Sequence, residues 1–250
     1  MPRYARKQSA TGIYHVIVRG INKQDLFYDN EDMGLFLQRL VYYKEECHFE
    51  LYGYCMMTNH VHLLIKETDT TISEIMKKLG TSYVHWYNWK YERSGHLFQD
   101  RFISEPVESD EYLLTVLRYI HQNPQKAKII STLESYEWSS YNRYLDNTNK
   151  IVDSKMVMDM LGGRERFKDF MFENANDVCL EAREKNRYKD EEVTALLKSK
   201  YEVKNPLELQ NMSREKRNII ISALKSTDGI SYRQIERITG IGRGAIEKCR

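Results

Sequence analysis

The sequence lacks the features that mark membrane, secreted and zinc-thiolate proteins. No stretch of its 250 residues approaches the roughly 18 apolar residues that a membrane-spanning helix needs. The basic start is followed at residues 8–12 by QSATG rather than by an apolar segment, so we do not expect it to act as a signal peptide. Its four cysteines contain no Cys-x-x-Cys pair, which argues against disulfides and thiolate metal sites. We therefore expect a reduced, cytoplasmic protein.

The chain also lacks a strong net charge. Its formal charge of +2 is too small to indicate nucleic-acid binding by itself. The basic residues are nevertheless concentrated at the two ends: Arg3, Arg6 and Lys7 form a basic arm, and residues 205–250 hold nine Lys/Arg against five Asp/Glu. The 18 tyrosines could stack on exposed bases beside such residues, although each one equally fits a half-buried surface.

The most informative stretch is residues 59–65, NHVHLLI, which is typical of a β-strand. Side chains alternate across a strand, so His60 and His62 project together from one face while Val61 and Leu63 face the other side. Two parallel imidazoles suit a divalent metal. The alternative is a pair of histidines that merely lines a half-buried sheet face.

Neighbouring segments supply a sheet and helices around that pair. Residues 12–20 predict a long strand, and residues 49–57 predict a strand that a tight turn joins to the histidine strand as an antiparallel hairpin. Asn30 and Thr71 each begin a segment with helical apolar spacing. The aromatic and basic residues 83–91 are predicted either to stack on unpaired bases or, more commonly for helical aromatics, to fill the core.

A further helix is predicted from an Asp110 cap to Asn123, ending before Pro124. Tyr119 and Asn123 are one helical turn apart at the edge of its apolar stripe. Tyr112 lies on nearly the same face but about 10 Å from Tyr119 along the axis, so only one of them can serve a given metal.

Two histidines with a nearby tyrosine point to phosphoryl transfer. A metal would polarise a phosphate while the phenol attacks phosphorus to give a phosphotyrosine. The amide oxygen of Asn123 is a sensible third ligand, and this pairing favours Tyr119 over Tyr112 as the nucleophile. An amide oxygen together with a phosphate favours Mg²⁺ or Mn²⁺, although zinc is conceivable.

Four ordered motifs resemble one family of DNA-processing enzymes. They are NHVHLLI at 59–65, LFQDRF at 97–102, RYIHQNP at 118–124 and WSSY at 138–141. In this order they are similar to the HUH-type single-tyrosine transposases of the IS200-like group, specifically the REP-associated tyrosine transposase branch. The resemblance covers about residues 3–145.

The resemblance implies an α+β, ferredoxin-like fold, with helices packed on an antiparallel sheet. It also implies cleavage and rejoining of single-stranded DNA beside hairpins or palindromes. His60 and His62 would be the paired metal ligands, and Tyr119 would form a 5′-phosphotyrosine. Asn123 would stand where related enzymes often carry glutamine, and its shorter side chain makes the third ligand less secure than the histidines.

The rest of the chain predicts a second, all-α part. We expect the catalytic domain to span residues 1–147, a helical connector 148–204 and a helix-turn-helix module 205–250. In that module a glycine turn at 240–242 separates two short helices, and Arg233, Arg243 and Lys248 are candidate DNA contacts. Any small three-helix bundle would show similar spacing.

The sequence thus predicts a metal-dependent transposase whose substrate is hairpin-bearing or palindromic, REP-like single-stranded DNA. A relaxase or replication-initiator nickase would share the histidines and the tyrosine. A non-catalytic nucleic-acid-binding regulator that kept the fold is the alternative from another class. Both a monomer and a homodimer remain open, and no membrane partner is expected.

Overall fold

A computed structural model describes residues 6–173, 175, 177, 179–180, 188–227 and 229–249. The chain divides into two compact units, Met1–Ala182 and Arg183–Arg250. In the part of the chain that the structure describes, no helix is both long and apolar enough to span a membrane.

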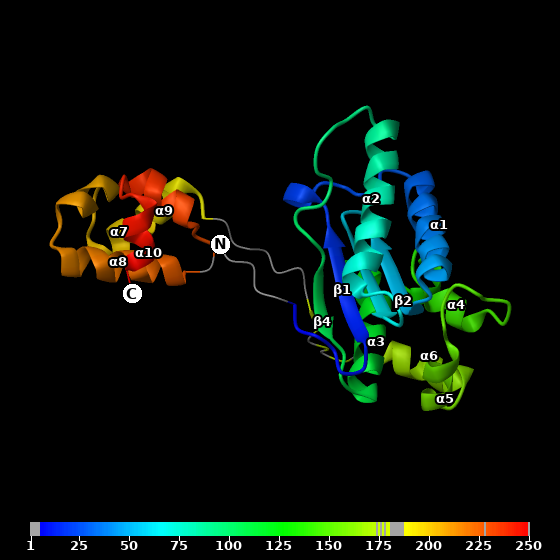
Figure 1. Cartoon of the computed structure of the whole chain (residues 1–250). Helices are drawn as coiled ribbons and strands as arrows, with labels where there is room; N and C mark the ends of the chain where they lie inside the picture. Colours follow the sequence, from blue (N-terminus) through cyan, green and yellow to red (C-terminus); the bar gives the residue numbers. More distant parts are fainter. Residues whose placement is uncertain are drawn as a thin grey trace. The chain divides into compact units, whose positions relative to one another are not determined.

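The first unit is built around a four-stranded antiparallel sheet (Figure 1). Its strands are β1 (Ile13–Arg19), β2 (Glu50–Met57), β3 (His60–Lys66) and β4 (Ile103–Pro106), in the order β2-β3-β1-β4. β-Branched and aromatic side chains favour these extended segments. β2 and β3 form the predicted hairpin, and β1 pairs with the other side of β3. The predicted antiparallel sheet with packed helices is confirmed, and the histidine strand is central in it.

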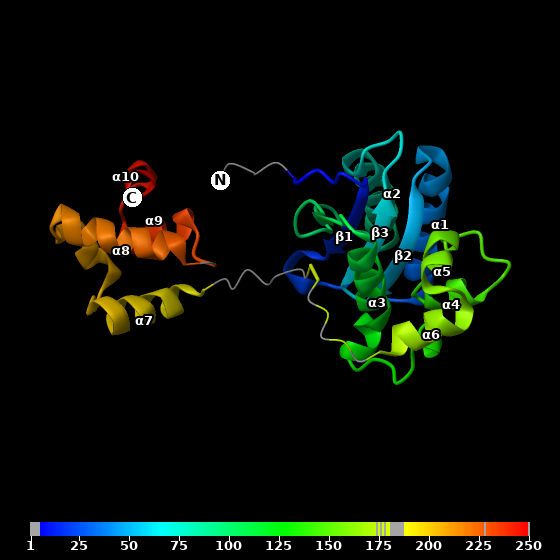
Figure 2. The same cartoon turned by 90° about the horizontal axis from the view of Figure 1, so that it is seen from below.

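Helices cover both faces of the sheet (Figures 1 and 2). α1 (Asn30–Cys47) and α2 (Ile72–Lys90) pack on one face, and α3 (Asp110–Lys126) packs on the other. Short 3-10 turns lie at Ile21–Lys23 and Leu133–Ser135, and the shorter helices α4 (Tyr141–Leu145), α5 (Lys155–Leu161) and α6 (Arg164–Phe172) complete the unit. The sheet is therefore the middle layer of three.

The aromatic end of α2 belongs mostly to the core. Tyr83 and Tyr87 are fully buried, and the Tyr83 hydroxyl donates a hydrogen bond to the Leu26 carbonyl at 2.6 Å. Thr71 caps α2 as predicted, accepting from the Glu74 amide. Trp89, by contrast, is 74% exposed.

α3 is longer than the sequence predicts. It begins after the Ser109 cap and continues through Pro124 to Lys126. Proline lacks the amide hydrogen of a normal helical turn, but only one turn follows it. The Ala127 amide donates to the Asn123 carbonyl at 2.9 Å, which closes that turn beyond the proline.

Residues 148–204, predicted to be a connector, are shared between the two units. Val157 of α5 and Phe167 and Met171 of α6 lie in the core of the first unit. The second unit contains α7 (Asp190–Tyr201), a 3-10 turn at Pro206–Asn211, α8 (Arg214–Ser226), α9 (Tyr232–Thr239) and α10 (Arg243–Lys248). Val193 and Leu197 of α7 pack in its apolar core.

Candidate functional site

His60 and His62 lie side by side on β3, on the sheet face that α3 covers. Their ring centroids are 5.0 Å apart. His60 pairs with Arg19 of β1, and His62 pairs with Ile17. This register places the two histidines on the same face of the strand, as predicted. His60 is partly exposed, whereas His62 is 2% exposed.

A close approach between helix and sheet brings Tyr119 to these histidines. A Cβ added to Gly53 of β2 would lie 2.6 Å from the Leu117 side chain of α3, so a larger residue would force that leucine side chain to move. The Tyr119 ring lies 5.7 Å from the His62 ring, centroid to centroid. The Lys126 ammonium is 5.0 Å from the Tyr119 ring centroid. Figure 2 shows α3 running along the sheet beside β3.

Asn123 lies one turn after Tyr119, as predicted, and its amide nitrogen donates to the Tyr119 carbonyl at 3.0 Å. The side chain therefore bonds along its own helix. Among the described residues, no group of three or more His, Cys, Asp and Glu side chains is arranged as a metal site. The role of Asn123 as third ligand stays a prediction.

Two residues that the sequence did not single out extend the site: His15, which is fully buried, and Glu105, which is partly buried. His15 Nε2 is 3.0 Å from His62 Nδ1, and His15 Nδ1 is 2.9 Å from Glu105 Oε1. His15 is fully buried on β1, and Glu105 pairs with it from β4. The signal that could have found His15 is the alternation along residues 12–20, which places it on one strand face with Ile17 and Arg19.

These hydrogen bonds assign the protons of both candidate ligands. The Glu105 carboxylate accepts the Nδ1 proton of His15, whose Nε2 then accepts the Nδ1 proton of His62. On His60, Nδ1 donates to the Asn59 side-chain oxygen at 2.7 Å. In both rings Nε2 is consequently the atom assigned to a metal.

The electrostatics keep the two imidazoles neutral. Burial and the positive charge of Arg19 lower the pKa of His60 to about 4. Burial, with His15 and His60 beside it, places the pKa of His62 well below its ordinary value. A neutral imidazole offers a lone pair, so the residues present fit a divalent cation at the two Nε2 atoms.

Tyr112, the rival nucleophile, lies at the Glu105 end of this chain. Burial alone would raise the pKa of Glu105, but hydrogen bonds from His15, the Leu180 amide and Tyr112 lower it below its usual value. Burial and the adjacent Glu105 raise the pKa of the Tyr112 phenol. Tyr112 therefore supports Glu105, whereas Tyr119 lies beside His62.

The other polar residues of the RYIHQNP and WSSY motifs hold α3 in place. Arg118 Nε donates to Asp177 at 2.8 Å, and Gln122 donates to the Met171 carbonyl at 2.9 Å. His121 Nε2 is 2.7 Å from the Ser140 hydroxyl, which accepts from the Tyr54 amide of β2. These bonds tie the helix that carries Tyr119 to the sheet and to α6.

The predicted DNA-contacting residues fall in separate places. Arg3 lies outside the described residues. Arg6 donates to the Ser73 hydroxyl at 3.1 Å and lies 3.7 Å from the Phe102 ring centroid, while Lys7 is exposed. In the second unit Arg233, Arg243 and Lys248 are all exposed.

The first unit is similar to known transposases. Residues 8–123 match the family model described as Transposase IS200 like. Over 158 residues the chain is 26% identical to the REP-associated tyrosine transposase of Haemophilus influenzae, which covers 57% of this chain and 87% of that protein. A solved structure of a REP-associated tyrosine transposase bound to a REP hairpin matches with a TM-score of 0.52 at 16% identity, covering 60% of this chain and 88% of the other. These matches confirm the resemblance inferred from the four motifs, and the structural match supports the fold.

Proposed function

We propose that this protein, whose residues 8–123 match the IS200-like transposase family model, cleaves and rejoins single-stranded DNA beside hairpins through a covalent bond to Tyr119. The observation that carries the proposal is the Tyr119 ring lying 5.7 Å from the ring of His62, beside the neutral histidine pair. The relative that was solved with a REP hairpin supports hairpin DNA as the substrate class.

The chemistry follows from these neighbours. When bound at His60 and His62, Mg²⁺ or Mn²⁺ would polarise the scissile phosphate. The Tyr119 hydroxyl gives its proton to solvent and attacks phosphorus; the bond from phosphorus to the 3′ oxygen breaks, and that oxygen takes up a proton from solvent and leaves as a 3′-hydroxyl. The DNA then stays on Tyr119 as a 5′-phosphotyrosine. A second 3′-hydroxyl then attacks the same phosphorus and releases the tyrosine. The new bond between that 3′ oxygen and phosphorus rejoins the DNA.

Two further contacts support the reaction. The Lys126 ammonium, 5.0 Å from the centroid of the Tyr119 ring, would place a positive charge near the phosphate that Tyr119 attacks. Glu105 and His15 fix the His62 ring so that Nε2 faces the site. Neither contact needs to change during the reaction.

The test is a covalent adduct. Wild-type protein incubated with a labelled hairpin oligonucleotide and Mn²⁺ is expected to give a protein-DNA band that survives SDS, and chelation of the metal is expected to remove it. Tyr119→Phe should abolish the band, a loss of at least about a thousandfold, because the attacking oxygen is gone. Tyr112→Phe is the matched control and should keep it.

Other outcomes would point elsewhere. An adduct in Tyr119→Phe that disappears in Tyr112→Phe would move the nucleophile to Tyr112. Hairpin binding without any adduct in the wild type would favour a non-catalytic DNA-binding regulator. Cleavage that survives chelation, or that survives in both His60→Ala and His62→Ala, would overturn the metal assignment.

For the second unit we propose binding of double-stranded DNA through α9, the turn at residues 240–242 and α10. Gly240 has a positive φ of 66°, which suits the sharp turn between the two helices. The exposed basic residues of these helices would face phosphates. The pair would then act as a helix-turn-helix, in which the second helix enters the major groove.

A further inference from the structure

The outer side of α2 carries an exposed row of side chains that the proposed reaction does not use. Lys77, Thr81, His85 and Trp89 recur every four residues and are all exposed, Trp89 to 74%. Residues four apart are neighbours on a helix surface, so these side chains form one continuous row. Trp89 therefore presents a large aromatic ring to solvent at one end of a row of polar and basic side chains.

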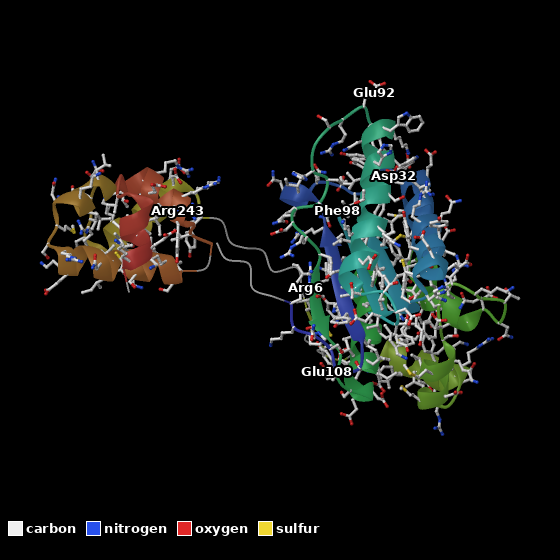
Figure 3. The ribbon with its side chains drawn as sticks, in the orientation of Figure 1. Arg6, Asp32, Glu92, Phe98, Glu108 and Arg243 are labelled. Carbon is white, nitrogen blue, oxygen red and sulfur yellow. The ribbon has the colours of Figure 1, made fainter. Side chains whose placement is uncertain are left out.

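Two cavities flank this row and share three of its residues. One, of about 890 Å³, includes Arg39 and Trp89 in its lining; the other, of about 720 Å³, includes Phe98 and Arg101. Both are lined by Lys77, Thr81 and His85. They therefore form one hollowed strip along α2, called here the α2 groove. Figure 3 shows Arg6 and Phe98, which line its second half, beside α2.

The charge of the α2 groove is predominantly positive. Its acidic lining residues are Glu74 and Asp100. Its basic ones are Arg6, Arg39, Lys77, Lys78 and Arg101. Among the described residues, the buried Nε of Arg39 has no hydrogen-bond partner, and neither does the buried side-chain oxygen of Asn88 in the second cavity. The side chains of Trp89 and Phe98 lie among these charges. The α2 groove is therefore suited to an anionic ligand whose own rings can stack on aromatic side chains.

The α2 groove lies on the sheet face opposite the histidines but connects to their end of the sheet. Val18 of β1 lines the groove. Its neighbours Ile17 and Arg19 face the other side of the sheet, where the histidines lie. Phe98 bridges to Gly20, and the Gln99 amide donates to the Arg19 carbonyl at 2.9 Å. Arg19 pairs with His60. A strand of DNA leaving the histidine site would thus reach the groove around this edge.

We propose that the α2 groove binds a segment of single-stranded DNA, with phosphates on Lys77 and Arg101 and unpaired bases against Trp89 and Phe98. The choice of DNA as substrate rests on the proposed function, but this binding site uses no residue of the proposed chemistry. Aromatic rings among basic side chains hold single strands with little dependence on sequence. The groove would hold the strand on either side of the cleaved hairpin.

The test uses the full chain and a fluorescent oligothymidine without a hairpin. Lys77→Ala combined with Arg101→Ala should weaken its binding at least tenfold and reduce the slope of log affinity against log salt by about 1.4, two single-strand phosphate contacts. Lys155→Ala, an exposed lysine on α5, is the control and should change neither. Trp89→Ala should weaken binding while Trp89→Phe restores most of it, because a ring can still stack.

Each outcome decides the proposal independently of the adduct. Thermal unfolding checks that the variants fold as the wild type does. Adducts formed at saturating hairpin DNA should persist in Lys77→Ala/Arg101→Ala, because the reacting groups are untouched. If the wild type forms no adduct but the variants still lose oligothymidine binding, the groove stands and the proposed function fails. Binding within twofold of the wild type in both the double variant and Trp89→Ala would overturn the groove, and would leave its apolar rings to a protein partner.

Discussion

The two units bury different kinds of side chain. The first unit buries His15, His62, Arg118 and His121 within its core. Among the described residues of the second unit, the buried polar side chains are those of Gln234 and Thr239, and its core is otherwise apolar. A buried titratable group costs stability unless it is neutral or paired. The first unit therefore holds titratable side chains inside its core, whereas the described charged side chains of the second unit lie outside its core.

The largest expected effect breaks the second unit without touching the first. Ile221 on α8 is fully buried, so Ile221→Ala should lower the free energy of unfolding of the second unit by about 2–5 kcal/mol. Calorimetry should show one transition shifted to lower temperature, and the Tyr119 adduct should still form at temperatures below it. Ile219 on the same helix is 65% exposed, so Ile219→Ala is the matched control and should have little effect. A loss of both transitions would show that the two cores do not unfold separately.

The second expected effect, a loss of stability in mild acid, should be confined to the first unit. All seven histidines lie between His15 and His121, and the pKa values of His60 and His121 are lowered to about 4 and about 3, chiefly by burial. Unfolded histidine titrates near 6.5, so below that pH the unfolded chain binds protons that the folded one does not. The free energy of unfolding therefore decreases as the pH falls below about 6.5. At pH 5 the decrease is about 2 kcal/mol for each of these two buried histidines.

The calorimetric transition of the second unit, identified by Ile221→Ala, should move much less between pH 7 and pH 5. Arg237 holds the pKa of Asp190 in that unit below its ordinary value, so the stabilisation from this pair is lost only in stronger acid. Equal shifts of both transitions would contradict the link between acid sensitivity and buried histidines. His121→Phe should reduce the pH dependence of the first transition by about one proton.

The sequence predicts the parts of the site that lie within one segment, and it misses the parts that meet from distant segments. The strand that holds His60 and His62, and the helix turn that joins Tyr119 to Asn123, are local patterns that single segments specify. His15 and Glu105 were missed because they meet across 90 residues of sequence, and only the register of β1 with β3 and β4 brings them to His62. The end of α3 was misplaced because the chain after Pro124 continues the helix for one more turn. The sequence of residues 148–204 does not indicate which of the two cores each of its helices packs in.

The third expected effect tests whether those long-range contacts matter to the site. Glu105→Gln keeps the shape but replaces the carboxylate that accepts the His15 proton with an amide, which weakens the orientation of His62. Mn²⁺ affinity, measured by calorimetric titration without DNA, should fall by about 10–100-fold, as for other partners of metal-ligating histidines. Hairpin binding in the absence of metal should be unchanged. Unaltered Mn²⁺ affinity would reduce Glu105 and His15 to core packing.

The smallest expected effect concerns the surface of the second unit. If α10 enters a DNA groove, Arg243→Ala should weaken duplex binding modestly and reduce its salt slope by about 0.9, one phosphate contact. Arg243 is exposed at the first position of α10, with Nε 3.0 Å from Glu247, so the arginine is not needed for packing. Arg237 on α9 is exposed too, but its guanidinium donates two hydrogen bonds to Asp190, whereas that of Arg243 donates one to Glu247, so Arg237→Ala is the matched control for an arginine held more firmly by a carboxylate. A decrease in slope for Arg243→Ala alone supports recognition by α10, because a non-specific basic surface would respond to the loss of either arginine. No decrease for either would make the second unit a helical bundle with another role.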